Sequence, residues 1–191
     1  MMMNERDIIR LAAEDEWMMD VLRAARSLAL PDWWACAGFV RSKVWDTLHG
    51  FEVRTPLPDV DIVYFDSEST DEAAEKEFER QLRVVMPDVP WSVKNQARMH
   101  TLNGNPPYAS SVDAISKFPE TVTALGLSMD DKGDMRLAAP CGIDDLVLMI
   151  VRPTPYVQAH PAMFGLYENR MAKKNWRAVW HRIEIQPIGP A

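Results

Sequence analysis

The chain has 191 residues, and its 21 Lys and Arg against 28 Asp and Glu give a formal net charge of −7. Hydrophobic residues make up 47% of the sequence and charged residues 26%, which is typical of a folded globular protein and excludes a disordered or fibrous one. An acidic chain is also poorly suited to coating nucleic acid or anionic membrane without regard to sequence. We therefore expect any bound phosphate to be held locally or through a cation.

The length corresponds to one domain, since domains commonly contain about 150 residues, and we expect that domain to span residues 1–191. It is expected to comprise N-terminal helices at 4–28, a core at about 33–152 and a C-terminal helix at about 167–183.

The two cysteines, Cys36 and Cys141, have no CxxC or Cys/His spacing around them. This pattern predicts neither a structural zinc site nor a disulfide framework, and it favours a reduced, cytoplasmic compartment. The N-terminus has no apolar h-region, and the longest strongly apolar run, 146–151, is far shorter than a bilayer span. We expect no membrane partner.

In the first part of the chain, two helices are expected before a buried strand. Asn4 is typical of a helix start, and apolar residues recur on one stripe between residues 15 and 28. The apolar run 33–37 ends at Gly38, which predicts a buried strand entering a turn, and a short helix is expected at 41–48.

The strongest strand candidate is 59–66, because of its β-branched and aromatic residues. A capping-box signature at 69–72 opens an acidic helix that Pro87 ends, and 91–100 is predicted as a third strand. The remaining expected elements are short helices at 111–118 and 120–125, a hairpin pairing 127–129 with 135–138, and helices at 143–151 and 167–183. This order predicts a mixed α/β fold.

Two carboxylates open the strand predicted at 59–66. Asp59 and Asp61 are two residues apart, so on a strand they project from the same face with Cα atoms about 6.6 Å apart. Carboxylates about 5 Å apart repel by roughly 3 kcal/mol at an effective dielectric of about 20, so the pair is expected to shift a pKa or hold a divalent cation. Mg2+ or Mn2+ suits such ligands and commonly arrives with substrate phosphates. The alternatives are a strand start that merely emerges into solvent and, as a minor reading, a phosphohydrolase centred on Asp66 beyond the apolar run.

Gly38 precedes a predicted helix, and backbone N–H groups at a helix N-terminus can bind phosphate. Arg41 and Lys43 are close enough in sequence to neutralise a polyphosphate, although a plain turn beside a solvated basic pair is the alternative. On the strand predicted at 91–100, a polar face is expected either to contact substrate or to meet solvent. Its members are Lys94, Gln96, Arg98 and His100.

Four blocks in the same order resemble a bacterial nucleotidyltransferase family that was first catalogued as a domain of unknown function. They are residues 37–50, 59–66, 94–100, and 142–146 with Arg152-Pro153. The resemblance spans about residues 15–185. It implies a compact nucleotidyltransferase fold of the DNA polymerase β type, in which a mixed β-sheet is flanked by helices.

The resemblance also implies a site and a reaction. Asp59 and Asp61 would be catalytic and hold the metal, and the Gly38 turn would face the nucleotide phosphates. The residues that would bind nucleotide are Gly38, Arg41, Ser42 and Lys43, and those that would line the substrate site are Lys94, Gln96, Arg98 and His100. The implied reaction transfers a nucleoside monophosphate from a nucleoside triphosphate to the hydroxyl of an acceptor, which is a small molecule, a protein or an RNA, and pyrophosphate leaves.

Two departures from the superfamily pattern bear on catalysis. The turn carries Phe39 where Ser or Gly is usual, and Ser92 stands where a third acid is expected. These departures leave open a non-catalytic nucleotide-binding or regulatory module on the same fold. Residues 167–191 carry five basic against two acidic residues, a net of 5 − 2 = +3, which favours the approach of an anionic acceptor.

Overall fold

The computed structural model describes residues 3–189 and is built on a five-stranded sheet in the order β3-β2-β1-β4-β5. The strands are β1 (Trp34–Cys36), β2 (Val60–Tyr64), β3 (Trp91–Asn95), β4 (Gly126–Met129) and β5 (Met135–Ala138). β2 pairs with β3 in parallel, and the other neighbours pair antiparallel. The predicted α/β class and the hairpin of β4 and β5 are confirmed.

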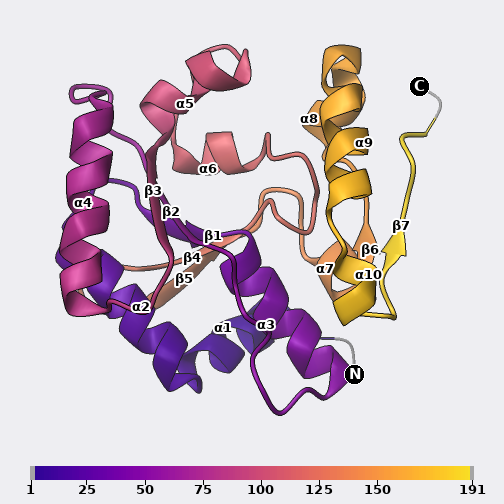
Figure 1. Cartoon of the computed structure of the whole chain (residues 1–191), viewed down its shortest axis with the longest axis horizontal. Coiled ribbons are helices and arrows are strands. Elements are labelled where there is room, and N and C mark those ends of the chain that lie inside the picture. The colour runs from indigo at the N-terminus through magenta and orange to yellow at the C-terminus, as the bar shows by residue number, and fades with distance from the viewer. Residues whose placement is uncertain (1–2, 190–191) are drawn as a thin grey trace.

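Helices surround this sheet (Figure 1). The first four are α1 (Glu5–Ala13), α2 (Glu16–Ser27), α3 (Gly38–His49) and α4 (Glu72–Val85). The later ones are α5 (Gln96–Asn103), α6 (Ser111–Ile115), α7 (Asp144–Leu148), α8 (Pro155–Ala159), the 3-10 turn η1 (Pro161–Met163), α9 (Phe164–Lys173) and α10 (Trp176–Val179). The short strands β6 (Ile150–Val151) and β7 (Glu184–Ile185) form a separate parallel pair. Within residues 3–189, no helix is long and apolar enough to cross a bilayer.

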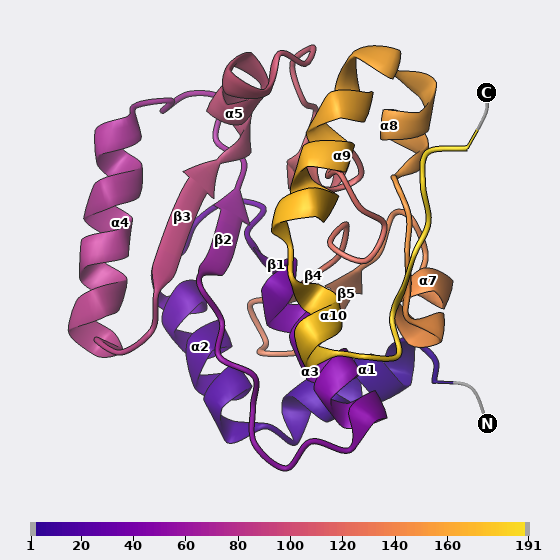
Figure 2. The same cartoon turned by 45° about the vertical axis from the view of Figure 1, so that its right-hand side comes forward.

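The two faces of the sheet differ in chemistry because successive side chains of a strand point to opposite sides. The side chains of β2 and β3 that join the main buried cluster with the first four helices are Val60, Ile62, Tyr64, Trp91 and Val93. Asp61 and its register partner Ser92 fall between these core positions and lie on the opposite face. The hydrophobic pattern therefore sends Asp61 away from the core and toward the side of the sheet that α9 and α10 approach (Figure 2).

Gly126 allows β4 to pack closely against β1. A Cβ at this position would lie 2.9 Å from Cys36 Sγ and 3.2 Å from Trp34 Cβ, closer than ordinary packing permits. Glycine is thus needed here for the close approach of β4 to β1.

The strand predicted at 91–100 is wrong beyond Asn95, where α5 begins. Asn95 is the N-cap, since its side chain accepts a hydrogen bond from the Ala97 N–H, and Gly104 ends the helix in the left-handed conformation. The expectation that Gln96, Arg98 and His100 share one strand face with Lys94 is therefore wrong, because all three lie on α5.

Three other expected elements are corrected. The helix expected at 143–151 ends at Leu148, because Met149 is left-handed and Ile150–Val151 forms β6. Residues 120–125 form turns instead of a helix, and buried Glu120 pairs with Pro153 through an isolated bridge. The single helix expected at 167–183 is two helices, α9 and α10, separated near Asn175. The apolar stripe of Trp176, Val179, Trp180 and Ile183 begins after this break and runs past the end of α10, so helical periodicity does not mark the boundaries of α10.

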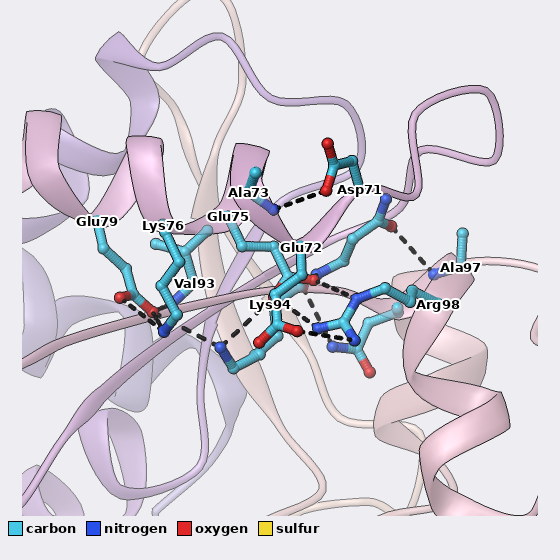
Figure 3. Close-up of polar contacts among 12 residues, drawn as sticks. Asp71, Glu72, Ala73, Glu75, Lys76, Glu79, Val93, Lys94, Ala97 and Arg98 are labelled. Carbon is cyan, nitrogen blue, oxygen red and sulfur yellow. Dashed lines mark hydrogen bonds and ion pairs between the residues drawn. The ribbon is translucent and has the colours of Figure 1, made fainter.

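A buried network of charges joins α4, β3 and α5 (Figure 3). Glu75 is fully buried and accepts hydrogen bonds from the Asn95 N–H at 2.9 Å and from Arg98 Nη2 at 2.8 Å. One turn later, Glu79 accepts from the Val93 N–H at 3.1 Å. The two carboxylates therefore fasten α4 along the edge strand β3 and orient the start of α5.

We expect Glu75→Ala to lower the free energy of unfolding by about 3 kcal/mol, because it leaves Arg98 and a buried backbone N–H without their partner. Urea unfolding measures this change. Glu77→Ala on the exposed side of the same helix is the matched control and should leave the midpoint unchanged. Equal losses in the two variants would contradict the structural role of the buried network.

Candidate active site

The turn between β1 and α3 is strained and opens onto a cavity. Ala37 has φ 54° and ψ −115°, an unusual conformation for a residue with a side chain, which costs on the order of 1–3 kcal/mol. Gly38 follows as the first helical residue, and no side chain caps the N-terminus of this 12-residue helix. The sharp turn thus falls on Ala37, and the N–H groups that begin α3 are available to an anion.

Asp59 and Asp61 lie at the start of β2 and line the same cavity as Gly38. Asp61 has Cys36 and Ser92 as register partners on the neighbouring strands. Burial and, to a lesser extent, the Asp59 carboxylate raise the pKa of Asp61 to about 6, and a hydrogen bond from the Ser92 hydroxyl opposes part of the shift. The charge on Asp61 is therefore poorly compensated by the protein, which is the environment in which a cation is stabilised.

Arg41 is a buried cation, and no carboxylate among residues 3–189 forms an ion pair with it. It is 7% exposed, and its Nε atom has no hydrogen-bond partner among the described residues. Its guanidinium lies over the Trp176 ring, 4.3 Å from the ring centroid, and lines the cavity beside Gly38. Burial lowers the pKa of Arg41 to about 10, so the side chain remains charged at neutral pH. Such a charge is expensive to bury unless an anion binds to it.

The C-terminal helices add two more cations that the motifs did not single out. Arg170 of α9 donates to fully buried Glu120, with Nε 2.6 Å from Oε1, and Lys174 follows where α9 ends. Burial acts against the charged form of Arg170, but the Glu120 carboxylate outweighs it and raises the pKa of Arg170. In the sequence, these two cations were indicated only by the basic excess of residues 167–191, which did not distinguish Arg170 and Lys174 from the neighbouring basic residues.

Asp46 holds this side of the site together. Its buried carboxylate accepts from the Thr55 N–H at 2.9 Å, the Thr55 hydroxyl at 2.7 Å and Trp180 Nε1 at 2.8 Å. It therefore ties α3 to the loop before β2 and to α10, which are three parts of the cavity wall.

Two cavities meet at Asp61. The first, of about 340 Å3, contains Gly38, Arg41 and Lys174 together with both acids. The second, of about 500 Å3, extends along β3 and α5 toward α9. The residues that line both are Ala37, Asp61, Thr123 and Arg170. We call the first cavity the phosphate cavity and the second the outer cavity.

The donor set fits one divalent cation that is completed by a substrate. Asp59 and Asp61 offer oxygen ligands on one cavity wall, but among residues 3–189 no group of three or more Asp, Glu, His or Cys is placed to hold a metal. Ser92 occupies the register position beside Asp61 where a third carboxylate would stand. Phosphate oxygens commonly supply the remaining ligands of Mg2+.

The candidate residues from the sequence are only partly brought together. Ser42 lines the phosphate cavity, and its buried hydroxyl has no hydrogen-bond partner in the described structure. Lys43 instead contacts Asp15, with Nζ 2.8 Å from Oδ2, and lies outside both cavities. Lys94 and Gln96 line the outer cavity, whereas Arg98 is engaged by Glu75.

His100 and Asp66 also lie outside both cavities. The His100 ring packs edge-on against Tyr108, with centroids 6.1 Å apart. Asp66, beyond the far end of β2, accepts the backbone N–H groups of Glu68 and Ser69 in a turn. This geometry does not favour a phosphohydrolase centred on Asp66.

Comparison with known proteins agrees with this geometry. A nucleotidyltransferase family model matches residues 23–185. The chain belongs to the nucleotidyltransferase family. The membership confirms the resemblance of the four sequence blocks and supports nucleotide binding. A comparison with curated proteins gave no match.

Solved structures support the same family assignment. An NMR structure described as revealing a CCA-adding enzyme head domain is 34% identical, with a TM-score of 0.87 and 96% of each chain covered. The Thermotoga maritima CCA-adding enzyme complexed with tRNA is 14% identical with a TM-score of 0.53, and the match covers 96% of this chain but 42% of that one. A tRNA-processing enzyme in an apo form is 18% identical, with a TM-score of 0.51 over 87% of this chain and 44% of the other. The last two show the fold alone, and this chain spans less than half of their length.

We expect Arg41→Met to raise the free energy of unfolding by about 1 kcal/mol, because it removes an unpaired buried charge. We also expect inorganic tripolyphosphate to stabilise the wild type against thermal unfolding, and Arg41→Met to abolish that stabilisation. Thermal unfolding with and without tripolyphosphate measures both effects. A clearly destabilised variant that still responds to tripolyphosphate would contradict the assignment of Arg41 to an anion site.

Proposed function

We propose that the protein is a Mg2+-dependent nucleotidyltransferase that transfers a nucleoside monophosphate from a nucleoside triphosphate to an acceptor hydroxyl. The observation that carries this proposal is the phosphate cavity, where two carboxylates face an unpaired buried arginine and the open N-terminus of α3. Family membership and the similarity to a CCA-adding enzyme head domain support the use of nucleoside triphosphates.

The triphosphate binds, in this proposal, between α3 and the C-terminal helices. The N–H groups at Gly38 and the Arg41 guanidinium contact the terminal phosphates, and Lys174 neutralises them from the opposite wall. Ser42 supplies a hydroxyl donor. Arg170, held by Glu120 at the junction of the two cavities, faces the phosphate nearest to Asp61. Most of the rate acceleration would then come from positioning and charge neutralisation.

Asp59 and Asp61 would hold Mg2+ or Mn2+, which when bound supplies positive charge that offsets the charge on the phosphate oxygens. The acceptor oxygen forms a bond to the α-phosphorus, the bond from that phosphorus to pyrophosphate breaks, and the hydroxyl proton passes to solvent. Arg41 and Lys174 stabilise the negative charge that accumulates on the departing pyrophosphate.

A non-catalytic nucleotide-binding module is the second candidate, and Ser92 is the observation that favours it. A hydroxyl stands beside Asp61 where a third acid would complete a two-metal site. Such a module would bind nucleotide in the same cavity without releasing pyrophosphate.

We further propose that the described residues form one domain and that the protein works in the cytoplasm. The main buried cluster includes residues from Ile8 in α1 to Ile183 after α10, so the two ends of residues 3–189 share one core. Cys36 and Cys141 are both free thiols, which suits a reducing compartment.

The first test measures label transfer from α-phosphate-labelled nucleoside triphosphates in the presence of Mg2+ or Mn2+. Small-molecule extract, total protein and total tRNA serve as separate acceptor pools. Asp59→Asn and Asp61→Asn should each reduce transfer by about a hundredfold or more, because each removes a metal ligand. Asp66→Asn, beyond the other end of β2, is the matched control and should transfer as the wild type does. Nucleotide binding without transfer in any pool would instead favour the module.

The second test restores the missing acid. Ser92→Asp should lower the Mg2+ concentration for half-maximal transfer by about tenfold, because cation affinity rises with the number of charged ligands. A titration of transfer rate against Mg2+ measures the shift, and Ser92→Asn, similar in size but neutral, should not produce it. An unchanged midpoint in Ser92→Asp would show that this position does not face the metal.

A further inference from the structure

We infer that the outer cavity is the acceptor pocket and that it takes a small molecule with a hydroxyl, a flat apolar body and an anionic group. This inference rests on the proposed function. It adds a class of acceptor for this chain, and that class differs from the tRNA bound in the structure of the Thermotoga maritima CCA-adding enzyme.

The position of the outer cavity follows from the geometry of phosphoryl transfer. Attacking and leaving oxygens lie roughly in line on opposite sides of the phosphorus. If pyrophosphate leaves toward Gly38, Arg41 and Lys174, the α-phosphate lies near Asp61 and the attacking hydroxyl arrives from the opposite side. The cavity on that side of Asp61 is the outer cavity, which shares Asp61 and Arg170 with the phosphate cavity.

The walls of the outer cavity are suited to a flat apolar group. At about 500 Å3, it is within the usual range for small-molecule sites. Its apolar and aromatic lining consists of Met99, Leu102, Tyr108, Phe118, Met163 and Leu166. Leu102 and Leu166 are 64% and 45% exposed, so a ligand that covered them would remove apolar surface from water. They come from α5 and α9, so a ligand that enters between these helices would bury both.

Lys94 supplies the charge that an anionic group would meet. Its Nζ lies 3.5 Å from Glu75 Oε2 and 3.6 Å from Glu79 Oε1, longer than strong charged hydrogen bonds (Figure 3). Both carboxylates are already engaged more closely, Glu75 by Arg98 at 2.8 Å and Glu79 by Lys76 at 3.1 Å. Lys94 is therefore held in position on the cavity wall by weak contacts, with hydrogen-bonding capacity left for a ligand.

An RNA acceptor is less consistent with the surface around this cavity. Tight binding of an RNA backbone needs a continuous basic surface, whereas this chain has a net charge of −7. Lys117, the third cation of the outer cavity, is paired with Asp113. A single anionic group fits this charge pattern better than a polyanion does.

The experiment records backbone amide spectra of the full chain with Mg2+ and a mixture of the four α,β-methylene nucleoside triphosphates. The probes are 4-(hydroxymethyl)benzoate and 4-(hydroxymethyl)phenyl phosphate, which together distinguish a carboxylate from a phosphate preference. Benzyl alcohol lacks the anion and glycerol 3-phosphate lacks the flat apolar body. At least one ring-bearing anion should shift the amides of Gln96, Leu102 and Leu166, with affinity about tenfold higher than either comparison compound.

Three results would overturn the acceptor pocket: no ring-bearing anion shifts these amides, total tRNA shifts them, or the nucleotide analogues occupy them. The analogues should instead shift the amides of Gly38 and Lys174. If the analogues do not shift the amides of Gly38 and Lys174, the result counts against the proposed function. These amides belong to the phosphate cavity, so their response does not depend on how the probes behave at the outer cavity.

A pair of variants tests whether the cavity itself binds the probes. Leu166→Trp should fill the outer cavity and weaken probe binding by at least tenfold while the analogue response at Gly38 persists. Leu148→Trp is the matched control, because Leu148 is an exposed leucine, 52% accessible, that lines neither cavity. Lys94→Met should weaken the anionic probes by about tenfold and leave benzyl alcohol unaffected. Equal binding in Leu166→Trp and Leu148→Trp would place the probe site elsewhere.

Discussion

The alternation of side chains along β2 is the constraint on which the rest of the structure depends. Val60, Ile62 and Tyr64 are buried against the helices on one face, so Asp61 must lie on the other. Moving the strand by one residue would place a carboxylate in the core and expose the apolar side chains, which makes the register unambiguous. The same register brings Asp61 beside Cys36 of the central strand β1 and Ser92 of the edge strand β3. Burial of one face thus determines the position of the proposed catalytic carboxylate on the other.

Charges in this protein fall into two groups with different purposes. In the network of α4, β3 and α5, each buried carboxylate is met by backbone N–H groups and cations, so the network stabilises the fold. At the site, the compensation is incomplete. Arg41 has no carboxylate partner in the part of the chain described, and Asp59 lies close enough to Asp61 to raise its pKa. Uncompensated charges of both signs around one cavity are consistent with a phosphate that binds together with a cation. The phosphate would neutralise Arg41, and the cation would neutralise the two carboxylates.

The division into two cavities gives the proposed reaction a direction. Asp61, Ala37, Thr123 and Arg170 separate a charged compartment at the N-terminus of α3 from a more apolar one beneath α5 and α9. Lys94 connects the network of α4, β3 and α5 to the site, because it belongs to that network and also lines the outer cavity. Through Lys94, the charges that fasten α4 to β3 also orient a group in the proposed acceptor pocket.

Local patterns in the sequence determined the α/β class and the order of the main strands along the chain, because each depends on residues close together in the chain. The association of Gly38 with Asp59 and Asp61, which are 21 and 23 positions away, was implied by the family resemblance and not by a local pattern. The start of α5 was missed because Asn95 acts as a helix cap only in its actual backbone conformation, and the residues after it alternate in polarity as a strand would. Only the tertiary structure decided which cations reach the site. Lys43, five residues from Gly38, is turned to Asp15 because α3 directs it away, whereas Arg170 is brought to Asp61 by the docking of α9 against Glu120. Proximity across the fold depends on packing between distant segments, and no periodicity within either segment encodes it.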